Sequence, residues 1–158
     1  MQRLFVCSLF LAVTGLLFGA DDKLAGTWKL NVAKSKPAPT PPGRGVKAET
    51  IVIPESGETA TVTISGTRED ASAILTKYTV PVHGGPVVYS EGAPPAGVSS
   101  ATKRIDDRTV DFITRQNGKD VSTNHVTVSA DGKTMRLSLK GTDAQGKPVQ
   151  SLAVFERQ

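Results

Sequence analysis

The sequence contains few of the residues that carry out catalysis or bind metal ions. It has two histidines, His83 and His125, and a single cysteine, Cys7. Zinc sites use three or four histidine, cysteine or carboxylate ligands, and neither a His-x-His nor a His-Glu-x-x-His pattern occurs here. The sequence therefore predicts no metal site and no cofactor.

His83 begins a His-Gly-Gly-Pro tetrapeptide that is similar to the oxyanion loop of esterases. That loop acts beside a Gly-x-Ser-x-Gly turn in a sheet flanked by helices, and the sequence offers neither feature. Gly and Pro residues that follow a strand are ordinary turn residues. We therefore interpret residues 83–86 as a turn and not as part of a catalytic site.

The carboxylates and the second histidine also lack a catalytic pattern. Asp106 and Asp107 are adjacent in a predicted turn, and exposed turn aspartates do not acquire the separated pKa values of an acid–base pair. Alternation along the strands assigns His125 and Asp111 to an outer face. A general base needs partners that orient it, and the strand of His125 supplies none. Inward carboxylates could still be hidden at Glu49 or Glu156, which alternation does not assign. We predict a protein that binds and does not catalyse.

Residues 1–20 have the layout of a secretory signal peptide. Arg3 supplies a short cationic start, a predominantly apolar run follows, and Gly19-Ala20 offers a cleavage site. Cleavage after Ala20 would remove Cys7 and leave a mature chain, residues 21–158, without cysteine. We expect a periplasmic or secreted protein without a stable membrane span. A retained N-terminal anchor is the alternative.

The mature chain has the length of one domain. The 158 residues carry a formal net charge of +4, spread through segments of mixed sign. A nucleic-acid-binding surface needs clustered lysine and arginine, so we expect no nucleic-acid partner. Without a disulfide, the domain must be stabilised by its hydrophobic core alone.

After residue 20 the sequence shows short runs of Val, Ile, Thr and Ser separated by turn residues, which is typical of an all-β protein. Most separators have hairpin length and favour neighbouring antiparallel strands. The pattern predicts a single up-and-down antiparallel β-barrel of about eight to nine strands. The predicted strands are residues 26–31, 46–53, 59–65, 73–82, 99–105, 109–115, 120–128, 134–140 and 149–155.

Two connections are longer than a hairpin turn. Residues 33–45 are rich in proline, which favours extended backbone and resists strand pairing. Residues 83–98 are rich in glycine and proline. Loops of this length in a compact domain are often functional or mobile.

The apolar pattern also predicts the register of one hairpin. A two-residue turn at residues 131–132 places Val128 opposite Met135 and Val126 opposite Leu137, so that one face is apolar. A slip of one residue would move this apolar face to solvent.

In the preceding hairpin the same argument favours a three-residue loop at Asn117-Gly118, with Gly118 in the left-handed region. This loop brings Val110 and Phe112 onto the apolar face and leaves Val121 on the wrong one.

Trp28, the single tryptophan, is expected to plug one end of the barrel. Gly26, two residues earlier, would let neighbouring backbone approach closely. Aromatic side chains bury ~150–250 Å² at ~25 cal/mol per Å², so the buried indole would contribute several kcal/mol.

The segment Gly-Thr-Trp-Lys-Leu at residues 26–30 resembles the Gly-x-Trp signature of lipocalins and their calycin relatives. The chain is more similar to small exported bacterial proteins described as lipocalin-like, whose motifs are turn and core residues. The matching segments are residues 26–31, 33–36, 103–106, 131–135 and 145–149.

The resemblance implies a barrel fold and not a site. It also implies that a last-strand arginine, Arg157, packs on Trp28 as a cation–π partner; a frayed terminal charge is the alternative. The chain lacks the disulfide, the second signature and the C-terminal helix of true lipocalins, which leaves retinoid and haem ligands without support.

Two functions fit these observations. The first is a binding protein for a small apolar or amphiphilic ligand, with Tyr78, Phe112, Tyr89 and Val87 as ligand-binding residues and residues 83–98 around the opening. Ligand sites do occur in barrel mouths. The second is a non-catalytic structural or interaction module with a filled barrel and an envelope protein as partner, because the mature chain has few aromatic side chains to line a pocket.

Overall fold

The computed structural model describes residues 22–39, 42–55, 57–143 and 146–158. The predicted signal peptide, its cleavage site after Ala20 and Cys7 lie outside these residues, so export stays a prediction. Within the described residues, no helix is long and apolar enough to cross a membrane.

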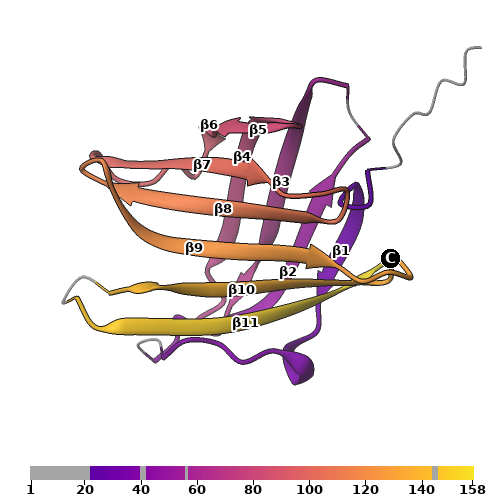
Figure 1. The fold of residues 1–158 in the computed structure, drawn as a ribbon. Helices are drawn as coiled ribbons and strands as arrows, with labels where there is room; N and C mark the ends of the chain where they lie inside the picture. Colours follow the sequence, from indigo (N-terminus) through magenta and orange to yellow (C-terminus); the bar gives the residue numbers. More distant parts are fainter. Residues whose placement is uncertain (1–21, 40–41, 56, 144–145) are drawn as a thin grey trace, which may run out of the picture.

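The described chain folds into eleven strands of one antiparallel sheet and one short 3-10 helix (Figure 1). Nine of the strands lie where the sequence predicts them, with ends that differ by three residues or fewer. The elements are β1 (Gly26–Leu30), η1 (Val32–Lys34), β2 (Val46–Ile53), β3 (Thr59–Arg68), β4 (Ala73–Pro81), β5 (Gly84–Pro86), β6 (Val88–Glu91), β7 (Val98–Arg104), β8 (Thr109–Gln116), β9 (Lys119–Val128), β10 (Thr134–Thr142) and β11 (Pro148–Arg157).

The sheet curls into a nearly closed barrel through two connections. First, β1 pairs with both β2 and β11, which joins the start of the meander to its end. Second, residues 84–91, here called the bridging segment, join β4 to β7. The half that forms β5 pairs with β7, and the half that forms β6 pairs with β4. Between the two halves, the Val87 N–H donates to the Ser100 carbonyl at 2.9 Å.

The bridging segment corrects two predictions. The described residues contain eleven strands and not eight or nine, because β5 and β6 lie within the segment predicted to be a loop. Gly84–Pro86 is a strand and not a turn, and exposed His83 lies in the turn before it. Much of residues 83–98 is therefore wall and not an open loop.

The hairpin of β9 and β10 has the predicted register: Val128 lies opposite Met135 and Val126 opposite Leu137. Its turn starts earlier than predicted, because the Gly132 N–H donates to the Ser129 carbonyl at 2.9 Å.

The hairpin of β8 and β9 reaches the predicted register by a different route. Asn117 and Gly118 form a two-residue turn, both with positive φ (49° and 79°), so the expected three-residue loop is wrong. Val110 still lies opposite Val126, because the register shifts at a β-bulge in which Val121 is the extra residue. Val121, which the predicted register leaves on the wrong face, is therefore the bulged residue.

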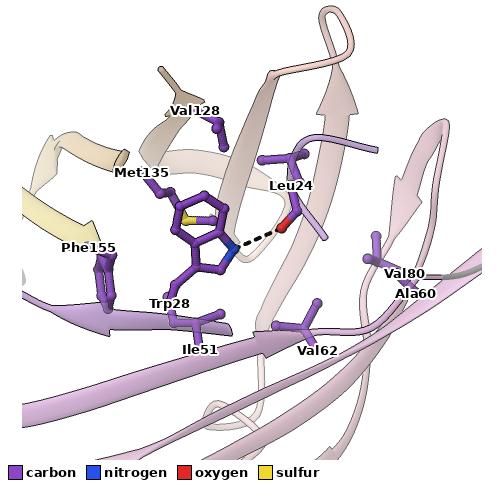
Figure 2. Packing of buried hydrophobic residues seen from close by; sticks show 9 residues of the cluster. All are labelled: Leu24, Trp28, Ile51, Ala60, Val62, Val80, Val128, Met135 and Phe155. Carbon is purple, nitrogen blue, oxygen red and sulfur yellow. Dashed lines mark hydrogen bonds between the residues drawn. The ribbon is translucent and has the colours of Figure 1, made fainter. Parts of the chain in front are cut away.

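The hydrophobic core gathers around Trp28 near one end of the barrel, here called the base, where residues 22–25 and Arg157 lie (Figures 1 and 2). Trp28 and Phe155 have no exposed surface. The Trp28 indole N–H donates to the Leu24 carbonyl at 2.9 Å, and Leu24 is itself buried. Trp28 is buried, as expected, and its role as a structural plug stays a prediction.

Arg157 packs on Trp28, with its guanidinium carbon 4.2 Å from the ring centroid. It also donates hydrogen bonds to the carbonyls of Ala25 (2.6 Å), Lys23 (2.8 Å) and Gly132 (2.6 Å). A Cβ at Gly26 would lie 2.3 Å from an Arg157 nitrogen. Gly26 therefore makes room for the guanidinium rather than for another backbone.

Candidate ligand-binding site

A cavity of about 230 Å³ lies inside the barrel beside the Trp28 core. Aliphatic side chains form most of its wall, because apolar residues alternate with polar ones along each strand and face inward. They include Ile51, Val62, Val80, Val110, Val126 and Leu137.

Three aromatic side chains form a second part of the wall. Tyr78 on β4 packs against Tyr89 on β6, with ring centroids 5.6 Å apart, and against Phe112 on β8 at 5.7 Å. All three line the cavity, so the fold brings together three of the four residues proposed to bind a ligand. Val87 is not part of this wall; it packs against the core cluster. The roles of these residues in binding stay predictions.

The polar groups of the wall differ in whether they are already bonded. The Tyr89 hydroxyl donates to Ser100 Oγ at 2.9 Å and so ties the bridging segment to β7. The Tyr78 hydroxyl, the Asn124 side-chain amide and the Thr76 hydroxyl make no hydrogen bond to any described residue. No sealed polar side-chain atom in the described chain lacks a partner, so these three groups are open to solvent.

The charged groups of the wall are paired with each other. Arg104 donates to Asp22 Oδ1 at 3.0 Å, and each side chain is 19% exposed. Arg104 also donates to the carbonyls of Asp106 and Asp107. This pair holds Asp22 at the base and leaves no free charge on the cavity wall formed by the described residues.

Tyr78 is a neutral group in this environment. Burial raises the pKa of its hydroxyl well above the ordinary value of 10, and the nearby Tyr89 raises it further. The hydroxyl therefore keeps its proton at any physiological pH and can donate one hydrogen bond.

Glu49 lies on the inward face of β2, one inward position beyond Ile51 and opposite Gly66. Burial raises the pKa of its carboxyl, and the nearby Arg68 guanidinium opposes that shift. The folded state therefore binds the Glu49 proton more tightly than the unfolded chain does. This linkage lowers stability as pH rises through and above the ordinary carboxyl value of 4.5.

Glu49→Gln is accordingly expected to gain stability relative to wild type as pH rises from about 4 to 7. Urea unfolding of both proteins at the two pH values measures the difference. Glu156→Gln is a control of opposite sign, because hydrogen bonds from Lys34 and Asn31 lower the Glu156 pKa. That variant should lose stability relative to wild type at pH 7, and the loss should shrink as pH falls. A Glu49→Gln difference that does not change with pH would contradict the assignment.

His125 has a partner that its own strand does not supply. Its Nδ1 lies 2.6 Å from Asp111 Oδ1 on β8, and the ring is 54% exposed on the outer face. Ser138 on β10 lies opposite His125 on the other side. None of the three lines the barrel cavity. Within the described residues, no group of three or more His, Cys, Asp or Glu side chains could hold a metal ion.

The sequence contains signals for Asn124, Glu49 and the partner of His125, whose places in the structure were not predicted. Asn124 alternates with Val126 and Val128, and Glu49 alternates with Ile51 and Ile53, so both follow the inward face. Both signals are a polar residue within an apolar alternation. The partner of His125 follows once Val110 is paired with Val126, because the next pair is Asp111 with His125.

Strand pairing and the cavity define an antiparallel β-barrel with a hollow interior. No family model matches the chain, and no curated protein matches it. Among solved structures, the structure of EF1p2_mFAP2b bound to DFHBI is similar, with a TM-score of 0.44 and 13% sequence identity over 88% of this chain and 97% of that one. A likeness at this TM-score supports no inference about function.

Proposed function

We propose that this protein is an exported, lipocalin-like binding protein that takes a small, mainly apolar molecule into its barrel cavity. The single observation that carries the proposal is the cavity of about 230 Å³ with its mostly apolar wall. Protein interiors pack closely and contain few voids larger than a water molecule. An empty apolar cavity of this size would cost on the order of 5 kcal/mol at ~24 cal/mol per Å³.

The alternative function, a structural module with a filled barrel, fits this cavity less well. A barrel that serves only as scaffold gains stability when larger side chains fill a cavity in its interior. Tyr78 and Asn124 also leave hydrogen-bonding groups unused at the cavity wall. A binding function accounts for both the space and the free groups.

The cavity sets an approximate size for the ligand. A 150 Å³ apolar cavity holds benzene, with its six non-hydrogen atoms, at ~25 Å³ per atom. At that ratio the space here accommodates about nine non-hydrogen atoms. Single-ring compounds with a short substituent have this size.

Calorimetric titration with ethylbenzene tests the proposal. We expect binding with a Kd on the order of 0.1–1 mM, as ligand efficiencies for such small molecules indicate. Val62→Phe places a ring into the cavity wall beneath Tyr78 and should abolish binding while the protein stays folded. Val88→Phe is the matched control, because Val88 is 67% exposed on β6. The proposal is overturned if neither ethylbenzene nor a polar compound of the same size binds, or if Val62→Phe binds as well as wild type.

A further inference from the structure

Of the three polar groups of the cavity wall that have no hydrogen bond within the described chain, those of Thr76, Tyr78 and Asn124, the last two lie against the same aromatic ring. Tyr78 packs on Phe112, with centroids 5.7 Å apart, and Asn124 on β9 lies opposite Phe112 on β8. Neither the Tyr78 hydroxyl nor the Asn124 amide is bonded within the described chain. Because no sealed polar side-chain atom of the described chain lacks a partner, both groups open onto the cavity, where a ligand can bond to them.

The same wall offers no free charge to a ligand. Asp22 and Arg104 are bonded to each other, and Arg104 is further bonded to two backbone carbonyls. Glu49 is not among the residues that line the cavity, and the Arg68 charge acts on its carboxyl. A charged ligand would lose its hydration in the cavity without gaining an ionic partner, and this loss is large.

We infer that the ligand is an electrically neutral, single-ring molecule with one hydrogen-bonding group, a carbonyl or a hydroxyl, bound between the Tyr78 hydroxyl and the Asn124 amide. The inference rests on the proposed binding function and adds the chemical class of the ligand. The phenolic hydroxyl donates to the polar group, and the amide can donate or accept. Phe112 and the aliphatic wall cover the ring.

Four probes of nearly equal size test the inference by calorimetry on the full mature protein. They are ethylbenzene, acetophenone, benzoate and 2-phenylethylammonium, which differ in polarity and charge. We expect acetophenone to bind about tenfold more tightly than ethylbenzene, the gain typical of one well-placed hydrogen bond. Benzoate and 2-phenylethylammonium should bind at least tenfold more weakly than acetophenone.

Two variants test the hydrogen bonds to the polar group of the ligand separately from the binding of its ring in the cavity. Tyr78→Phe and Asn124→Leu should each weaken acetophenone binding several-fold and change ethylbenzene binding less than twofold. Ser138→Ala is the control, because Ser138 lies beside the outward His125 and does not line the cavity. It should keep the preference for acetophenone. A thermal melt of each variant verifies that it is folded.

Each outcome decides between the two proposals. If ethylbenzene binds and acetophenone binds no more tightly, the inference is wrong and the binding function stands. The inference is also wrong if either charged probe binds best, or if Tyr78→Phe and Asn124→Leu both keep the preference for acetophenone. If none of the four probes binds, the proposed function fails as well.

Discussion

Trp28→Ala is expected to lower the free energy of unfolding by about 3–5 kcal/mol, the range for truncation of a buried tryptophan. The indole has no exposed surface and packs among Ile51, Met135 and Phe155 (Figure 2). The variant also leaves the Leu24 carbonyl without its indole donor. Because total stabilities are about 5–15 kcal/mol, this loss removes a large part of the stability of the fold.

Urea unfolding followed by far-ultraviolet circular dichroism measures this effect without using tryptophan fluorescence. Trp28→Phe keeps an aromatic ring and should lose less stability than Trp28→Ala. Val32→Ala is the surface control, since Val32 is 53% exposed, and should change stability by less than about 0.5 kcal/mol. If Trp28→Ala melts within a few degrees of wild type, the tryptophan is not the structural centre of the base.

The strands that could be predicted from the sequence are those with one buried face. In β9 and β10, Val126, Val128, Met135 and Leu137 occupy alternate positions, and only one register places all of them inside. A slip would expose the whole apolar set, so the pattern determines the pairing. Trp28 is predictable for a related reason, because a large aromatic side chain in a small domain is rarely left in water.

The bridging segment could not be predicted in the same way. Its two halves pair with different strands, β7 and then β4, so no alternation runs through residues 84–91. Gly84 and Gly85 have positive φ values of 94° and 149°, a conformation that sequence rules associate with turns. The pairing is set by the gap that β4 and β7 leave, which is a property of the whole barrel.

The cavity depends on the same closure. Tyr78, Tyr89 and Phe112 come from three strands, and their mutual packing exists only once β6 pairs with β4. The direction of each side chain follows from local alternation. The cavity volume is the difference between the volume of the barrel interior and that of the side chains in it. No local sequence pattern predicts this difference.

Arg157→Ala should lower the free energy of unfolding by about 3 kcal/mol. The guanidinium stacks on Trp28 and donates to three backbone carbonyls, including those of Lys23 and Ala25. Hydrogen bonds from a charged group contribute about 1.5–3 kcal/mol each, although the contributions of such a cluster are not additive. Arg157→Lys keeps the charge and loses the planar fork, so it should recover only part of the loss. Arg136→Ala, at an exposed position on β10, is the control.

A double-mutant cycle tests whether Arg157 acts by holding residues 22–25 against the base. Leu24 is the larger of the two buried side chains of that segment. Its neighbours Lys23 and Ala25 provide two of the three carbonyls that accept hydrogen bonds from Arg157. If Arg157 stabilises residues 22–25, Leu24→Ala alone already loosens their contact with the base. Arg157→Ala then has less of that contact left to remove. The double variant should then lose at least about 1 kcal/mol less than the sum of the single losses. Strict additivity would show that Arg157 stabilises Trp28 and Gly132 directly, and that residues 22–25 remain in place without it.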